Sequence, residues 1–173
     1  AVKQDWIRSM NKKAIVFCCS NPVPEIYPYA AKEAGACIVA TGRGDFPNQV
    51  NNSMGFPGIL KGALLVHASK ITDNMAIAAA YSLAKYAEKR GISPEDIIPR
   101  MDEPGVFAEE AADVAMQAIK DGVAHIKMSW DQVYARATED IDNARDTTRM
   151  LTEKGLIKSP NTGMLQEALD WAV

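Results

Sequence analysis

The chain has 173 residues, of which 47% are hydrophobic and 24% are charged, and its formal net charge is −3. These values describe a globular chain with a core, and the scattered Lys and Arg residues with a net negative charge argue against a nucleic-acid-binding surface. No apolar run of membrane-spanning length occurs. The three cysteines, Cys18, Cys19 and Cys37, lie in apolar runs without metal-ligand spacing, which favours buried, reduced thiols in the cytoplasm.

Two predicted strands with a helix between them open the chain. Residues 14–19 are a continuous apolar run, which indicates a strand covered on both faces, as in a parallel sheet. Residues 37–41 are a short β-rich run and form the next predicted strand. The intervening prolines favour a helix that starts near Pro24 and ends at about Ala34, with Gly35 as its cap. Strand, helix and strand together predict a βαβ unit.

Helices dominate the rest of the sequence. A small apolar helix is expected after residues 48–52, and its Gly58 and Gly62 are four residues apart, which lets a helix approach another backbone closely. Thr72 or Asp73 caps a helix to Lys89, which is apolar all round near its start and is therefore predicted to be deeply packed. Further helices are predicted over residues 93–96 (one turn), 108–120, 129–154 and 164–173.

The predicted elements place the chain in the α/β class, with an incomplete Rossmann-type parallel sheet and a predominantly helical C-terminal half. Two strands make a poor independent sheet, and the chain opens without Met on residues typical of the end of a helix. We therefore expect a fragment of a longer protein. Its open strand edge would recruit another chain, which predicts a homo-oligomer.

Amide side chains follow both predicted strands. Asn21 comes after the first strand, and Asn51 and Asn52 come after the second, beyond a glycine turn. Ligands of open α/β sheets bind beyond the carboxyl ends of the strands, and an amide can bind a carboxylate, a carboxamide or a ribose hydroxyl without adding charge. The same spacing also fits Asn21 as a helix cap and the Asn pair as turn residues. Asp45 beside Arg43 is expected to form a loop ion pair.

Several common motifs are missing from the sequence. It contains no G-x-G-x-x-G turn, no Walker loop and no cluster of His, Cys, Asp or Glu with metal-ligand spacing. The sequence therefore offers no pattern that predicts a pyrophosphate-binding turn or a metal site in this chain.

Three motifs between Ile15 and Leu64 carry a family resemblance. They are Ser-Asn-Pro-x-Pro-Glu, Ala-Thr-Gly-Arg-x-Asp-Phe-Pro-Asn-Gln-Val-Asn-Asn and Phe-Pro-Gly-Ile. Together they closely resemble the malic enzymes in their shorter prokaryotic-type form, and the similarity covers about residues 6–158. In these terms, residues 1–128 are the C-terminal half of a Rossmann-like NAD(P)-binding domain, and residues 129–173 are the C-terminal helices.

The resemblance implies a cytoplasmic NAD- or NADP-dependent enzyme that oxidises malate and releases CO₂ and pyruvate with the help of Mg²⁺ or Mn²⁺. It implies that Asn21 and Asn51 contact the cofactor and that Asn51 and Asn52 contact malate. The family's catalytic Tyr and Lys, its metal ligands and its glycine-rich turn would all precede Ala1. The chain alone is therefore expected to be inactive and to bind dinucleotide weakly or not at all.

Two alternatives to a malic enzyme remain open. One is a malolactic enzyme, which converts malate to lactate and CO₂ with tightly held NAD. The other is a non-catalytic α/β interaction module on the same scaffold. In such a sheet, an acidic or basic residue after the second strand selects NAD or NADP. That strand would also precede Ala1, so the sequence leaves both cofactors open.

Overall fold

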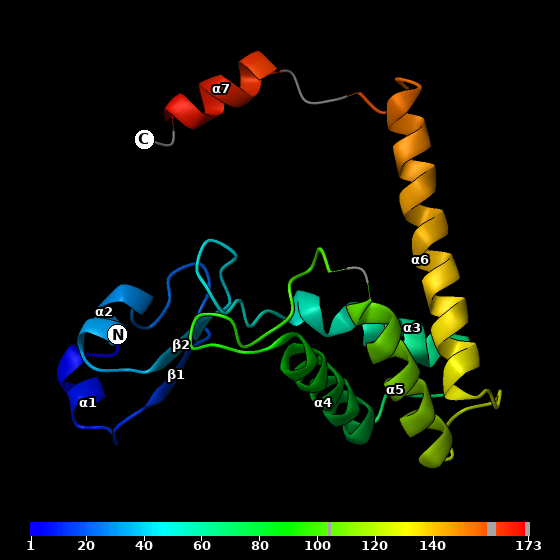
Figure 1. The fold of residues 1–173 in the computed structure, drawn as a ribbon, viewed down its shortest axis with the longest axis horizontal. Coiled ribbons are helices and arrows are strands. Elements are labelled where there is room, and N and C mark those ends of the chain that lie inside the picture. Colours follow the sequence, from blue (N-terminus) through cyan, green and yellow to red (C-terminus); the bar gives the residue numbers. More distant parts are fainter. Residues whose placement is uncertain (104, 159–161, 172–173) are drawn as a thin grey trace. The chain divides into compact units, whose positions relative to one another are not determined.

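The computed structural model describes residues 1–103, 105–158 and 162–171 (Figure 1). The chain divides into two compact units, residues 1–137 and residues 138–173. Among the helices of these described ranges, none combines the length and the apolar character that crossing a bilayer requires.

A parallel sheet lies at the N-terminal side of the first unit. Strands β1 (Ile15–Cys18) and β2 (Ile38–Thr41) pair in parallel, from Ile15 opposite Ile38 to Cys18 opposite Thr41. Helices α1 (Gln4–Arg8) and α2 (Pro28–Glu33) lie beside them (Figure 1). The βαβ unit and the incomplete parallel sheet are therefore confirmed for the described residues.

The two strands of this sheet differ in how their faces are covered. Cys18 and Val39 are each 1% exposed and pack in a cluster with Ile26 and residues of α1 and α2. On the opposite face of β1, Ile15 and Phe17 are 52% and 54% exposed. The expectation of a strand covered on both faces is thus wrong for β1, because α1 and α2 both pack on the face that carries Cys18. In β2, the neighbouring residues Val39 and Ala40 point to opposite faces and are 1% and 0% exposed.

Helix α2 begins later than its prolines predict. The Glu25 carboxylate accepts hydrogen bonds from the Ser20 backbone N–H at 3.1 Å and from the Ser20 hydroxyl at 2.7 Å. These contacts hold residues 20–25 as a loop, so the helix starts only at Pro28. Its end is as predicted, with Gly35 at a φ of +104°.

The remaining elements are helical. In chain order they are η1 (Asn52–Met54), α3 (Phe56–Leu65), α4 (Asp73–Arg90), α5 (Val106–Lys120), α6 (Trp130–Glu153) and α7 (Thr162–Trp171). The Thr72 hydroxyl accepts the Met75 N–H at 3.2 Å, and Ser129 and Gln132 form the predicted reciprocal cap. The predicted helical turn at 93–96 is wrong, because Ser93 and Asp96 pair their backbones reciprocally in a tight loop instead.

Helices α3 and α5 approach each other closely at two glycines of α3. A Cβ at Gly62 would lie 2.4 Å from the Ala111 carbonyl oxygen, and a Cβ at Gly58 would lie 2.1 Å from the Glu110 carboxylate. The predicted close approach is therefore confirmed. These helices, with α4 and the start of α6, bury the second core cluster, which includes Met75, Val114 and Val133.

Helix α4 is packed on one side only. Met75 is fully buried and Ala79 is 2% exposed, whereas Ile77 and Tyr81 are 53% and 65% exposed. The prediction that this helix is packed all round is therefore wrong for the described residues, since α4 presents one face to α5 and leaves the other open.

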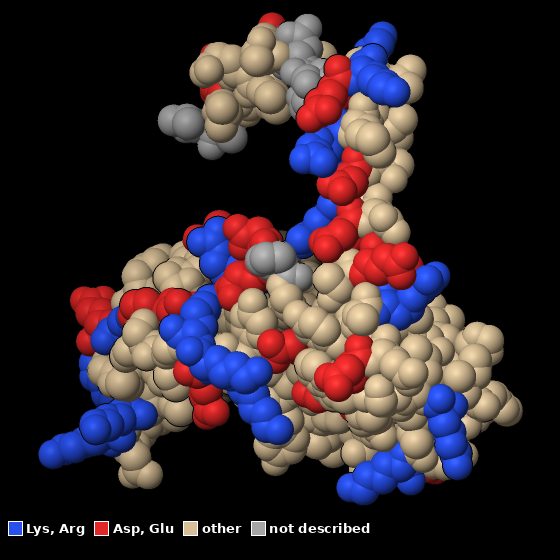
Figure 2. All heavy atoms as spheres, turned by 45° about the vertical axis from the view of Figure 1, so that its right-hand side comes forward, with Lys and Arg blue, Asp and Glu red and all other residues tan. Residues whose placement is uncertain are grey.

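The second unit is helical and has little core of its own. The described residues of α7 include none that is buried, and Met164 and Trp171 are 68% and 92% exposed. Figure 2 shows red and blue side chains interspersed along α6, which fits a solvated, charged helix surface.

Candidate functional site

A cavity of about 530 Å³ lies in the first unit. Its wall is formed by Phe17 of β1, residues 50–52, 54 and 55, Ile59 of α3, small and aliphatic residues of α4 between 76 and 84, and Ile97 with Ile98. Among the described residues that line it, only Asn51 and Asn52 carry a polar side chain. The cavity is therefore an open apolar pocket with two neutral amides at one place, which suits the few-polar-group pattern of small-molecule sites.

Asn51 uses both ends of its amide to build the turn after β2. Its Nδ2 donates to the Gly42 carbonyl at 2.7 Å, and its Oδ1 accepts the Ser53 N–H at 2.9 Å. The side chain thus caps η1 and ties it to the end of β2. One Nδ2 hydrogen and one oxygen lone pair remain for a ligand.

Asn52 differs from its neighbour. It is exposed, and its side chain makes no hydrogen bond to any other residue that the structure describes. Both its donors and its acceptor are therefore available to a ligand in the cavity.

Asn21 lies on the exposed loop after β1 and is not among the residues that line this cavity. The structure thus brings Asn51 and Asn52 together and places Asn21 one loop away. Arg43 connects the two loops, because its Nη1 donates to the Pro22 carbonyl at 3.0 Å. Arg43 also pairs with Asp45 at 2.5 Å, as the sequence predicts, and this pairing lowers the pKa of Asp45.

Asn48, which the sequence did not single out, connects three backbone segments. It is 5% exposed and has a φ of 56°. Its Nδ2 donates to the carbonyls of Val39 at 3.1 Å and Pro94 at 2.8 Å, and its Oδ1 accepts the Ile97 N–H at 3.0 Å. Asn48 therefore holds Ile97, and with it part of the cavity wall, against β2.

Replacing Asn48 by alanine is expected to lower the free energy of unfolding by about 3 kcal/mol, because three backbone groups, one of them buried and two partly buried, lose their partner at once. Amide hydrogen exchange at Ile97 should accelerate together with this loss. The matched control is Gln49→Ala on the same loop, expected to cost about 0.5 kcal/mol or less. Unchanged protection of Ile97 in Asn48→Ala would contradict the bridging role.

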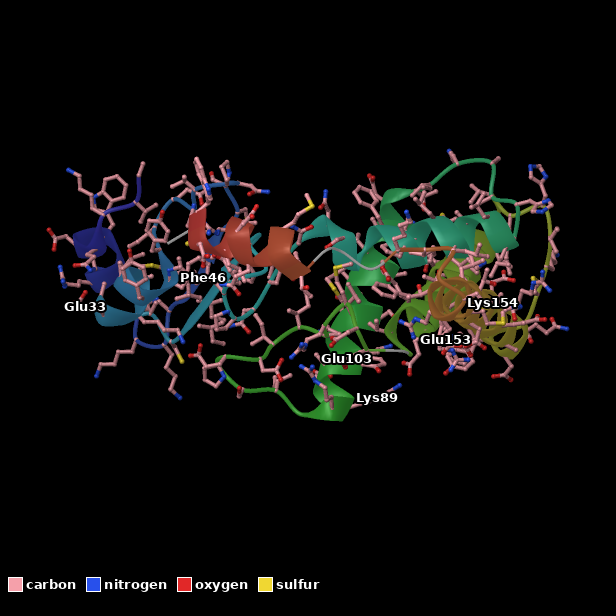
Figure 3. All side chains as sticks on the ribbon, turned by 90° about the horizontal axis from the view of Figure 1, so that it is seen from above. Glu33, Phe46, Lys89, Glu103, Glu153 and Lys154 are labelled. Carbon is pink, nitrogen blue, oxygen red and sulfur yellow. The ribbon has the colours of Figure 1, made fainter. Side chains whose placement is uncertain are left out.

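The loop after α4 is fixed mainly by one guanidinium. Arg90 donates to Asp96 and Glu103, each at 2.5 Å, and to the Ile98 carbonyl at 3.3 Å. Figure 3 labels Glu103 and Lys89 beside the last turns of α4. Exposed ion pairs stabilise weakly one at a time, but three acceptors on one side chain orient the segment that carries Ile98.

The described residues bring no three metal-ligating side chains of His, Cys, Asp or Glu together. All three cysteines are free thiols. Cys18 is buried, which raises its pKa, but Cys19 is exposed, so the expectation of buried thiols is wrong for that residue.

A buried carboxyl is the second functional feature that the sequence analysis missed. Glu110 of α5 is 0% exposed. It falls four residues after Val106 and four before Val114, both of which are buried, so helical periodicity could have placed it in the core.

Comparison with known proteins decides the family. The family model described as "Malic enzyme, NAD binding domain" matches residues 1–123 of this chain. The chain belongs to the malic enzyme family. The bifunctional malic/malolactic enzyme of Bacillus subtilis is 43% identical over 133 residues, which are 77% of this chain and 32% of that protein.

Solved malic enzyme structures agree in fold. The Entamoeba histolytica malic enzyme matches 99% of this chain with a TM-score of 0.96 and 65% identity. The Pyrococcus horikoshii malic enzyme matches 88% of it with a TM-score of 0.83 and 48% identity. This chain covers 35% of each of those proteins, so it spans about a third of their length. The predicted fold class, part of a Rossmann-type domain, is confirmed.

Proposed function

We propose that this chain is the part of a malic enzyme cofactor domain that contacts the nicotinamide end of NAD or NADP and the substrate malate. The observation that carries the proposal is the apolar cavity in which Asn51 and Asn52 are the polar side chains, in a chain of this family. The donors of Asn52 suit a malate carboxylate, and the remaining hydrogen of Asn51 suits either the carboxylate or the cofactor carboxamide. Asn21, on the neighbouring loop, is assigned to the cofactor.

The apolar wall supports the same assignment. A flat nicotinamide ring can pack on Phe17, Ile97 and Ile98, and exclusion of water favours hydride transfer between ring and substrate. In the whole enzyme, malate would be oxidised at its hydroxyl carbon, and the resulting keto acid would lose CO₂ to give pyruvate. Residues 1–128 would supply this half of the cofactor domain, and residues 129–173 its C-terminal helices.

The divalent cation of the reaction does not fit the described residues, because they form no ligand cluster. We therefore assign Mg²⁺ or Mn²⁺, and the acid–base residues, to the two-thirds of the malic enzyme length that this chain does not span. We assign the assembled protein to the cytoplasm and to a homo-oligomer, which the uncovered face of β1 supports.

The test is a chimera in which residues 1–158 replace the matching part of the Entamoeba histolytica enzyme, with which the chain shares 65% identity. The chimera is expected to oxidise malate with Mn²⁺ and NAD⁺ or NADP⁺, whereas the isolated chain should show no turnover. In the chimera, Asn52→Ala should lower kcat/KM for malate about 100-fold, since a hydrogen bond to a charged group is lost. The control is Gln49→Ala, expected to change it less than about 3-fold.

Two results would contradict the proposal. Turnover by the isolated chain would refute its assignment as a part, and full activity of the Asn52→Ala chimera would refute the malate contact. The printed name of the Bacillus subtilis relative keeps malolactic chemistry as a second candidate, and product analysis of the chimera separates lactate from pyruvate.

A further inference from the structure

Glu110 is a buried acid without a hydrogen-bonding partner. Its side chain is fully buried, and neither carboxylate oxygen makes a hydrogen bond to another described residue. Burying a polar group without a hydrogen bond costs free energy, so the presence of an acid at this position needs an explanation.

The carboxyl group lies against the first turn of α3. A Cβ at Gly58 would overlap Oε2, at 2.1 Å, and a Cβ at Gly55 would lie 3.8 Å from Oε1. Gly58 is the third residue of α3, so its N–H is one of the donors that have no partner inside the helix. Glu110 therefore occupies the space that Gly58 leaves, beside the positive end of the α3 dipole.

The same turn joins directly to the candidate site. Gly55 follows η1, which starts at Asn52 and is capped by Asn51. Gly55, Asn51 and Asn52 all line the 530 Å³ cavity. Gly55 thus lies both against the Glu110 carboxyl and in the cavity wall, so a shift of the Gly55 turn would change the positions of both amides.

Two influences act on the acidity of Glu110. Burial raises its pKa from 4.5 to about 8, and the Gly58 N–H, which is near the carboxyl but outside hydrogen-bonding geometry, lowers the pKa by a smaller amount. The titratable and charged side chains on the helices packed around it are Lys61 on α3; Asp73, Tyr81, Lys85, Tyr86, Glu88, Lys89 and Arg90 on α4; and Glu109, Asp113 and Lys120 on α5. None of them is among the groups that shift this pKa.

We propose that Glu110 is a proton-sensitive positioning residue for Asn51 and Asn52. As a neutral acid it fills the space beside Gly58 and leaves the turn from η1 to α3 as observed. As a carboxylate it attracts the Gly58 N–H and the α3 N-terminus, which moves the Gly55 turn and the two amides at the cavity. The identity of the ligand rests on the proposed function, but this movement does not.

The test is an NMR titration of the 173-residue chain from about pH 6 to about pH 9.5, which brackets the transition. The side-chain carboxyl carbon of Glu110 and the amides from Asn52 to Gly58, with the Asn52 side-chain NH₂, should follow one transition near pH 8. Glu110→Gln should abolish it at the amides. Glu109→Gln, on the neighbouring position paired with Lys89, should leave it unchanged.

Several outcomes overturn the inference. A Glu110 carbon that does not titrate between about pH 6 and about pH 9.5, amides that stay flat while it titrates, or an amide transition that persists in Glu110→Gln would each do so. The carbon and amide signals of the unsubstituted chain decide the matter even where Glu110→Gln fails to fold. The chimera assay described above tests the proposed function separately. A chimera without malate turnover would contradict the proposed function, whereas a flat NMR titration would contradict only this inference.

Discussion

Replacing Gly62 by alanine is expected to lower the free energy of unfolding by about 3 kcal/mol or more, the largest effect of any glycine substitution in α3. The new Cβ would lie 2.4 Å from the Ala111 carbonyl oxygen and 3.0 Å from the Val114 Cβ. The first of these atoms belongs to the backbone of α5, so no side-chain rotation relieves the overlap and the two helices must separate.

The surroundings of Gly62 prevent an easy adjustment. Ala111, Val114 and Ala115 are all 0% exposed, and the adjacent Ala63 is 9% exposed. Alanine gains about 1 kcal/mol of helix propensity over glycine, which offsets only part of the cost.

Gly55→Ala is the matched control for this substitution. Its Cβ would meet neighbours only at 3.7 and 3.8 Å, which is ordinary contact, so its stability should change by about 0.5 kcal/mol or less. Urea unfolding followed by circular dichroism measures both variants. Equal stabilities for Gly55→Ala and Gly62→Ala would show that α3 and α5 are not held at this distance in solution.

Replacing Glu110 by glutamine is expected to remove a large pH dependence of stability. The pKa of Glu110 is about 8 in the folded chain against an ordinary value of 4.5. Between these values the folded chain retains a proton that the unfolded chain has lost, so the free energy of unfolding falls as pH rises. The fall amounts to roughly 5 kcal/mol in total, of which roughly 4 kcal/mol lies between about pH 5 and about pH 9, and it ends once the pH exceeds the folded pKa.

Comparison of the two chains isolates this effect, because every other group titrates in both. At about pH 5 their stabilities should be similar, and by about pH 9 Glu110→Gln should be the more stable by roughly 4 kcal/mol. Urea unfolding at a series of pH values measures the difference. The free energy of unfolding of Glu109→Gln should vary with pH in parallel with that of the unsubstituted chain. If the curve of Glu110→Gln were also parallel, the pKa of Glu110 would not be strongly raised.

Features fixed by local chemistry were predictable from the sequence. Three helices are predicted to end at 89, 120 and 154, and the glycines just beyond these ends, Gly91, Gly122 and Gly155, all adopt a positive φ. The Ser129–Gln132 cap is likewise set by residues three apart. Such signals need no knowledge of the tertiary structure.

Features that depend on distant residues were not predictable. Asn48 bonds Pro94 and Ile97, which are 46 and 49 residues away, and the sequence alone offers no sign of this. The start of α2 was missed because a single carboxylate, Glu25, holds the preceding loop. The structure places Asn51 and Asn52 in the wall of one cavity. Asn51 also stabilises the turn, because its Oδ1 accepts the Ser53 N–H, so the turn role that the sequence left open and the place in the cavity wall apply to the same side chain.

The fit between Gly58 and Glu110 also constrains how this chain can diverge. A glycine at position 58 leaves a notch that the acid at position 110 fills completely. A homologue with a larger residue at 58 therefore needs a shorter one at 110, and a homologue that loses the acid leaves an empty space against α3. We therefore expect the two positions, 52 residues apart in the sequence, to change together among homologues.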